Sequence, residues 1–183
     1  MKNAIVERLI DGNRRYLCAQ ANPGDVSPAL RLRTAQEGQQ PHTVVVCCAD
    51  SRVVPEAIFS AGLGELFVIR IAGNVLDDHQ LGSIEYAAAH LGCGLILVLG
   101  HTGCGAVSAA LSGHGEGYIR YITDEILRAV GEERDPGRAC ILNVEHAVET
   151  ILRAFADHPE IPSAALDIRG AVYDIRSGEF AWL

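Results

Sequence analysis

Two short stretches of the chain place thiols, an imidazole and an acid–base pair at close spacing. Cys48, Asp50 and Arg52 lie in "CADSR", directly after an apolar run, and His101 and Cys104 lie in "GHTGCGAV". A thiol at the start of a helix is favoured as the thiolate, the form that binds metal. Two thiolates and one imidazole suit Zn²⁺ and leave one coordination position open, as catalytic zinc sites do.

Purely structural roles for these residues also fit the sequence. Cys48 and Cys104 can be small core residues, and His101 can be a hydrogen-bonded loop histidine. Asp50 and Arg52 can form a loop salt bridge that contributes little stability. A structural zinc site is commonly closed by a Cys-x-x-Cys pair, and the sequence contains no such pair.

The strand period helps to choose between the two adjacent cysteines that end the run "HTVVVCC". Successive side chains of a strand point to opposite faces, so Cys47 and Cys48 do not easily serve one centre. Cys48 is the last residue before the loop, and we therefore expect it to be the ligand and Cys47 to be packed in the core.

Cysteine catalysis without a metal fits the spacing less well. The cysteine phosphatase loop requires Cys-x5-Arg, whereas Arg52 lies four positions after Cys48 and five after Cys47. A nucleophile elbow at Cys104 would need glycine where the chain has Thr102 and Ala106. A cysteine hydrolase that uses Cys104 is therefore a disfavoured alternative.

The positions of these residues depend on the strands and helices around them. Continuous apolar runs predict strands covered on both faces, and amphipathic segments predict helices. We expect strands at 42–48, 65–73, 94–101 and on both sides of a turn at 176–178, and helices at 1–20, about 28–38, 54–60, 81–92, 103–111, 121–130 and 139–158. This alternation predicts an α/β fold with a mostly parallel central sheet flanked by helices, in which ligands bind at the carboxyl ends of strands.

Composition and charge narrow the class of protein. The chain has 183 residues and a net charge of −8 without a long basic run, which disfavours a nucleic-acid surface. We expect one domain over 1–183, with an N-terminal helical arm over about 1–38. No apolar run is long enough to span a bilayer. Six cysteines without a signal peptide favour a reducing compartment, and we expect a cytoplasmic protein.

The two motifs also carry a family resemblance. "CADSRV" and "HTGCGAV" resemble the paired Cys-x-Asp-x-Arg and His-x-x-Cys signatures of β-class carbonic anhydrases. The segments "GNRRY", "LFVIRIAGN", "GSIEYAAAHL" and "GAVYDIRSGEF" resemble further parts of that family in the same order. The resemblance covers nearly the whole chain. It implies the β-carbonic anhydrase fold and the reversible hydration of CO₂ to bicarbonate and a proton by zinc-bound hydroxide.

The resemblance assigns a role to each residue of the two motifs. It makes Cys48, His101 and Cys104 the ligands of one Zn²⁺ per chain. It makes Asp50 the acceptor of a hydrogen bond from the zinc-bound hydroxide. Arg52 then keeps Asp50 ionised and oriented, and an Asp50 released by Arg52 could close the open position on zinc.

The resemblance also implies a substrate pocket and an assembly. Gln39 matches a family glutamine that hydrogen-bonds substrate, and Gly105 lines the site with its backbone. Phe67 and Tyr86 match residues that line the apolar CO₂ pocket, in the family partly across a dimer interface. We therefore expect a homodimer or a dimer of dimers.

Hydration of CO₂ also requires a path for the released proton. His90 lies four residues after Tyr86 on a predicted helix, and His79 lies in "LDDHQ", which we expect to be a loop. Either can shuttle protons near neutral pH, and each can also be an exposed histidine without a role. Two other functions stay open, namely hydrolysis of COS or CS₂ on the same zinc scaffold and a non-catalytic zinc-binding or sensor domain.

Overall fold

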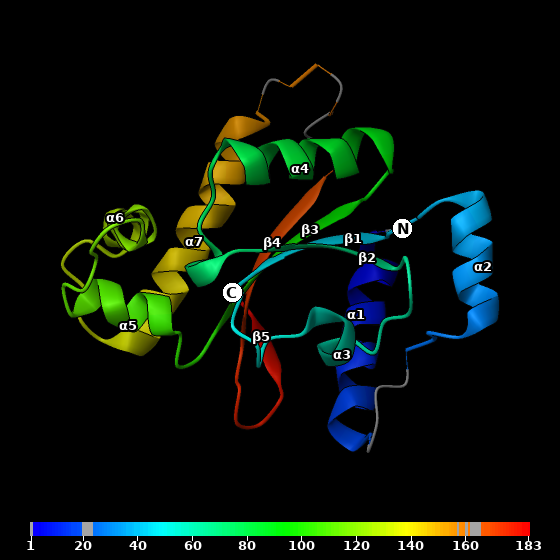
Figure 1. Cartoon of the computed structure of the whole chain (residues 1–183), viewed down its shortest axis with the longest axis horizontal. Coiled ribbons are helices and arrows are strands. Elements are labelled where there is room, and N and C mark those ends of the chain that lie inside the picture. Colours follow the sequence, from blue (N-terminus) through cyan, green and yellow to red (C-terminus); the bar gives the residue numbers. More distant parts are fainter. Residues whose placement is uncertain (1, 20–23, 157, 160, 162–165) are drawn as a thin grey trace.

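A central sheet holds the chain together in the computed structural model, which describes residues 2–19, 24–156, 158–159, 161 and 166–183. The strand order is β2-β1-β3-β4-β5 (Figure 1). The strands are β1 Thr43–Cys47, β2 Leu66–Arg70, β3 Leu95–His101, β4 Asp167–Tyr173 and β5 Phe180–Trp182. β1 to β4 are parallel, and β5 runs antiparallel to β4. The predicted mostly parallel sheet is therefore confirmed.

Helices cover both faces of this sheet. They are α1 Lys2–Cys18, α2 Pro28–Glu37, α3 Pro55–Ile58, α4 Asp78–His90, α5 Gly105–Leu111, α6 Ile119–Val130 and α7 Pro136–Ala154, with a 3-10 turn η1 at Ala72–Asn74. α1 and α3 lie on one face, and α4 and α7 lie on the other (Figure 1). α5 and α6 pack with α7 around a third apolar cluster, which contains Cys48 and Cys104. None of the helices in the described residues is long and apolar enough to cross a membrane.

The alternation of β1 separates its two cores. Val45 and Cys47 pack with residues of α1 and α3, whereas Val44 and Val46 pack with residues of α4 and α7. All five residues of β1 are buried, as expected for a strand covered on both faces. Cys48, the next residue, lies in the third cluster, so the two adjacent cysteines have different surroundings.

The register brings the two motifs together at the carboxyl ends of the neighbouring strands β1 and β3. Cys47 pairs with Leu99 of β3 and with Arg70 of β2. Cys48 is the first residue after β1, and His101 is the last residue of β3. Neighbouring strands lie about 4.8 Å apart, so both motifs leave the sheet within reach of each other.

The N-terminal arm contains α1 and α2. α1 packs on the sheet, whereas α2 stands apart from the sheet layers (Figure 1). α2 begins at Pro28, and the hydroxyl of Ser27 accepts a hydrogen bond from the Leu30 backbone N–H at 3.2 Å. Leu30 is the buried residue of this helix, so α2 contributes little to the core of one chain.

Two predicted boundaries are wrong for local reasons. β2 ends at Arg70 and not at 73, because Gly73 and Asn74 adopt positive φ values of 68° and 45° in the η1 turn. α4 begins at Asp78, so His79 lies in its first turn and not in a loop. The cap is built by Asp77, whose carboxylate accepts the His79 backbone N–H at 2.9 Å.

Other element ends differ by a few residues. α3 is shorter than predicted, and α6 and α7 begin two and three residues early, at Ile119 and Pro136. The predicted helix ends at 1 and 20 and residue 157 of the last predicted helix lie outside the described residues.

Candidate metal centre

Cys48, His101 and Cys104 come together at the carboxyl ends of β1 and β3. Their ligand atoms, two sulfurs and one imidazole nitrogen, all lie within 4.8 Å of one another, and all three residues are buried. The structure thus brings together the residues that the sequence predicts as metal ligands. It also disfavours His101 as a loop histidine, because its side chain is fully buried at the end of a central strand.

The hydrogen bonds of His101 leave one ring nitrogen free. Nδ1 lies 3.0 Å from the carbonyl oxygen of Thr102. A carbonyl oxygen can only accept, so this bond places the ring proton on Nδ1 and leaves the Nε2 lone pair available. Nε2 is buried without a hydrogen-bond partner; within the described chain, only Asn74 Nδ2 is a second such side-chain atom.

The sulfurs of Cys48 and Cys104 differ in their hydrogen bonds. Cys48 Sγ accepts the backbone N–H groups of Asp50 at 3.4 Å and of Gly73 at 3.3 Å. The hydrogen bond from the Cys104 thiol is the main cause that lowers the pKa of Cys48 to about 4. The same hydrogen bond, together with burial, raises the pKa of Cys104. The hydrogen bonds that the Cys48 sulfur accepts favour its thiolate form, which is the form that binds metal.

Asp50 and Arg52 form a bidentate ion pair beside these ligands. Arg52 Nε donates to Asp50 Oδ1 at 2.9 Å, and its Nη2 donates to Oδ2 at 2.6 Å. These hydrogen bonds hold the pKa of Asp50 well below its usual range. Asp50 Oδ2 lies 4.0 Å from His101 Nε2. The pair therefore lies beside the free imidazole nitrogen. This position disfavours the alternative that Asp50 and Arg52 form only a loop salt bridge away from the ligands.

The side of the site next to α5 is open. Gly105 is the first residue of α5 and is exposed. A Cβ built on Gly105 would meet no atom of the described residues within 4 Å. The absence of a side chain at this position therefore leaves free space directly beside Cys104.

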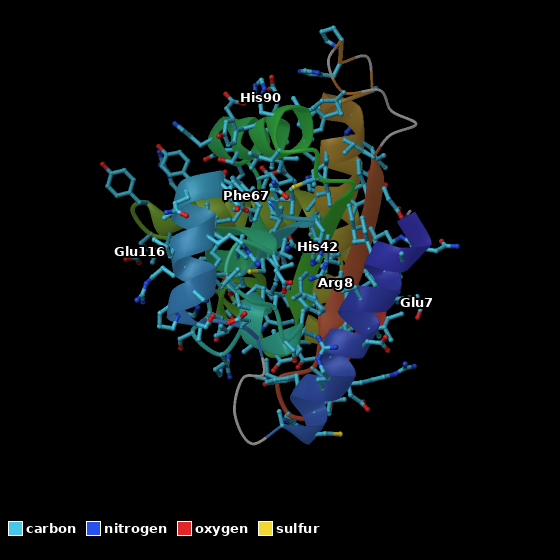
Figure 2. The ribbon with its side chains drawn as sticks, turned by 90° about the vertical axis from the view of Figure 1, so that its right-hand side faces the viewer. Glu7, Arg8, His42, Phe67, His90 and Glu116 are labelled. Atoms are coloured by element: carbon cyan, nitrogen blue, oxygen red, sulfur yellow. The ribbon has the colours of Figure 1, made fainter. Side chains whose placement is uncertain are left out.

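The remaining predicted pocket residues do not meet the ligands within one chain. Phe67 and Tyr86 form an aromatic pair with ring centroids 6.3 Å apart, and His90 lies 5.5 Å from the Tyr86 ring. Phe67 and His90 are labelled in Figure 2. Phe67 pairs with Val44, four residues before Cys48, so it lies roughly 13 Å from that end of the sheet along the strand.

Gln39 and His79 are also away from the ligands. Gln39 is exposed and follows the helix α2, which stands apart from the sheet (Figure 1). The side chain of His79 is 94% exposed and lies 3.6 Å from the Asp77 carboxylate. In the described residues, no hydrogen bond or ion pair joins either side chain to the ligands.

Sequence reasoning missed Arg70 and Gly73, which shape the loop after β1. Arg70 donates to the backbone carbonyl of Asp50 at 2.7 Å, and Gly73 donates to the Cys48 sulfur at 3.3 Å. Both lie in "RIAGN", at the carboxyl end of the strand predicted over 65–73. Ligands bind at the carboxyl ends of strands in parallel sheets, so this position was the sequence signal that could have identified them.

The donor set fits zinc. Tetrahedral Zn²⁺ with thiolate and imidazole ligands requires donor atoms roughly 3.5–4 Å apart, which the 4.8 Å limit on this cluster accommodates. The buried Nε2 of His101 gains a partner when a metal binds. The residues present therefore fit a three-ligand zinc site.

Comparisons with known proteins agree with this geometry. A family model described as carbonic anhydrase matches residues 43–180. Over 186 aligned positions, the chain is 38% identical to carbonic anhydrase 2 of Mycobacterium tuberculosis, covering 96% of this chain and 89% of that protein.

Solved structures of β-carbonic anhydrases have the same fold. One from the fungus Aspergillus fumigatus superposes with a TM-score of 0.73 at 27% identity, covering 85% of this chain and 81% of that chain. A tetrameric enzyme from Sordaria macrospora has a TM-score of 0.67 at 29% identity, covering 85% and 87%. The family match spans both motifs and the strands β1 to β4. The chain therefore belongs to the β-carbonic anhydrase family.

Proposed function

We propose that this protein catalyses the reversible hydration of CO₂ to bicarbonate and a proton, with one Zn²⁺ per chain held by Cys48, His101 and Cys104. The observation that carries this proposal is the free, buried Nε2 of His101, with two cysteine sulfurs and the Asp50–Arg52 pair around it. Family membership supports the same reaction.

Zinc would supply a Lewis acid that acidifies water and so provides a nucleophile for CO₂ near neutral to alkaline pH. Asp50 is the acceptor that orients this water, because its carboxylate is ionised and lies 4.0 Å from the free nitrogen of His101. Arg52 holds both oxygens of that carboxylate. Arg52 also donates to the carbonyl of Gly103 at 3.3 Å, which ties the pair to the turn between the other two ligands.

A second copy of the chain is part of this proposal. Phe67, Tyr86 and Gln39 lie away from the ligands of their own chain, so a pocket that contains them requires a partner's residues. Phe67 lies on β2, an edge strand, and Tyr86 is 48% exposed. We therefore propose a homodimer or a dimer of dimers, and the tetrameric Sordaria macrospora enzyme supports an assembly.

His90 is the better candidate for the proton shuttle. Its ring packs 5.5 Å from that of Tyr86, a proposed pocket residue. His79 has a weaker position, because its nearly fully exposed side chain faces Asp77. We propose that His90 carries protons between the pocket and solvent, with His79 as the alternative.

The chain is proposed to be a single domain over 1–183 with a helical arm over about 1–38. One sheet carries all the described strands, which supports this division. A reducing compartment, the cytoplasm, is proposed because Cys48 and Cys104 must remain reduced to bind zinc. The six cysteines all lie in the described residues, and none of them forms a disulfide there.

Metal analysis combined with stopped-flow CO₂ hydration tests the function. We expect about one zinc per chain, loss of hydration after the metal is removed, and recovery when Zn²⁺ is returned. A zinc-loaded protein that hydrolyses COS or CS₂ but does not hydrate CO₂ would contradict the proposal. A zinc-loaded protein without activity on any of the three gases would favour a binding domain.

A further inference from the structure

The buried face of α7 carries two polar side chains that reach the segments around the metal ligands. Cys140 and Asn143 are three residues apart, so they lie on the same side of the helix. They are only 4% and 3% exposed, respectively. Neither is part of the two motifs, and a buried amide requires a hydrogen-bond partner to offset its desolvation.

Cys140 is bonded to the end of β3 that bears a ligand. Its thiol donates to the backbone carbonyl of His101, with 2.8 Å between sulfur and oxygen. Cys104 lies in the same buried cluster as Cys140. One side chain from α7 is thus hydrogen-bonded to the main chain of His101 and packs in the cluster that contains Cys104.

Asn143 acts on the third ligand through one intermediate. Its Nδ2 donates to the carbonyl oxygen of Gly73 at 2.7 Å. The N–H of Gly73 donates to the sulfur of Cys48 at 3.3 Å. The two peptide groups of Gly73 are therefore held between the amide of Asn143 and the sulfur of Cys48.

Two glycines allow α7 to approach closely enough for these bonds. A Cβ on Gly100 would lie 2.5 Å from Val144 Cγ2, and a Cβ on Gly170 would lie 2.8 Å from Val144 Cγ1. Val144 therefore packs directly against the backbone of β3 and β4. Cys140 is about one helical turn before Val144, and Gly100 directly precedes His101, which explains the contact between Cys140 and His101.

We propose that Cys140 and Asn143 are positioning residues of the metal centre, through which α7 fixes the positions of the ligands His101 and Cys48. This inference rests on the proposed function. Groups that orient ligands in this way typically change metal affinity or activity by about 10–100-fold when they are removed. A purely packing role predicts reduced stability without a specific effect on the bound metal.

The test measures the metal directly. Zinc-loaded wild type, Cys140→Ala, Cys140→Ser, Asn143→Ala and Ile151→Val are mixed with a colorimetric chelator, and the rate of zinc release is recorded. Cobalt-substituted samples report ligand geometry through thiolate-to-cobalt charge-transfer and d–d bands. Ile151→Val is the matched control, because Ile151 is fully buried on α7 and its aliphatic side chain has no hydrogen-bonding group.

We expect zinc release about tenfold or more faster in Cys140→Ala and Asn143→Ala, with shifted cobalt bands. Cys140→Ser keeps a donor for the His101 carbonyl, and we expect release within about threefold of the wild-type rate. Ile151→Val is expected to match wild type in both measurements.

Wild-type release rates and cobalt spectra in both alanine variants would overturn the inference, whatever their thermal stability. The two residues use separate hydrogen-bond paths, so either alanine variant suffices if the other does not fold. If neither folds while Ile151→Val does, the residues are structural and the inference is also overturned. A wild type that binds no zinc contradicts the proposed function and the inference together, whereas an active zinc enzyme with unaffected variants contradicts the inference alone.

Discussion

Adjacent cysteines at the end of β1 have opposite chemical environments. Cys47 is fully buried in the core beneath α1 and α3, where burial raises the pKa of its thiol to about 12. The pKa of Cys48 is lowered to about 4, mainly by the hydrogen bond from Cys104. A neutral thiol packs well among apolar side chains, and a thiolate is the form that binds metal. One step along a strand therefore separates a core residue from a proposed ligand.

This contrast predicts different effects of two alanine substitutions. Cys48→Ala should reduce bound zinc to less than about a tenth of wild type, because two ligands hold zinc poorly. Cys47→Ala should keep full zinc and lose about 1–3 kcal/mol of unfolding free energy through a small cavity. Elemental analysis and urea unfolding of both variants check this. Full zinc in Cys48→Ala would show that it is not a ligand.

The three proposed ligands are predictable from sequence because they follow or end strands that pair in register. Residue types and the strand period are enough to place Cys48, His101 and Cys104 at the carboxyl ends of parallel strands. Cys140 and Asn143 could not be found this way. Their roles depend on how a helix that begins about 30 residues after the second motif packs on β3, which local periodicity does not encode.

The short η1 turn after β2 affects both the packing of the chain and a proposed metal ligand. It ends β2 early, presents the N–H of Gly73 to the Cys48 sulfur, and packs against α5 and α6. A Cβ on Gly73 would lie 2.8 Å from Ile126 Cδ1 and 3.1 Å from Ala106 Cβ. Glycine is thus required here by both conformation and space.

We expect Gly73→Ala to lower the unfolding free energy by about 1–3 kcal/mol and to weaken zinc binding. Gly82→Ala is the matched control, because Gly82 lies within α4 and a Cβ there would meet no atom of the described residues within 4 Å. That substitution should raise stability by about 0.5–1 kcal/mol. Equal stability of Gly73→Ala and wild type in urea unfolding would contradict this account of the turn.

The contact between α1 and the start of β1 adds a pH dependence. Arg8 of α1 lies next to His42 (Figure 2) and pairs with Glu65. Burial, followed by the charge of Arg8, lowers the pKa of His42 to about 4. Between about pH 6.5 and 4 the unfolded chain binds a proton at this position that the folded chain does not. Stability from this group is therefore present above about pH 6.5 and is lost as the pH falls toward 4.

His42→Gln should remove this contribution to the slope. We expect the unfolding free energy of wild type to fall more steeply than that of His42→Gln between pH 6.5 and 4, by about 1–2 kcal/mol after allowance for the partial exposure of the ring. Urea unfolding at several pH values gives the difference. Parallel curves for the two proteins would rule out a buried neutral His42.

One chain contains the proposed ligands but does not complete the proposed pocket. The sheet has two edges, β2 and β5, and β2 carries Phe67. The fold and the family were predictable from sequence, because the alternation of strands and helices and the motifs are local signals. The proposed assembly could not be predicted from such local signals, because the sequence pattern of one chain does not encode which of its surfaces meet a second copy.

We expect light scattering at assay concentration to give roughly two or four times the 19.6 kDa mass of one chain. On dilution, activity per chain should fall as the mass falls toward that of a monomer, because each pocket loses its partner's residues. A fully active monomer would contradict the proposed shared pocket.

We propose that Asp50, held ionised by Arg52, orients the water that attacks CO₂ beside a zinc ion held by Cys48, His101 and Cys104. Stopped-flow CO₂ hydration by zinc-loaded wild type and Asp50→Asn from about pH 6.5 to 9 tests this role of Asp50. The pKa of Asp50 lies well below this range, so Asp50 stays ionised throughout it. Wild-type activity should therefore rise toward alkaline pH as the reacting water loses its proton. Asp50→Asn should retain zinc and lose roughly 10²-fold or more in rate. Wild-type turnover in zinc-loaded Asp50→Asn, or a wild-type rate that does not change with pH, would contradict the account.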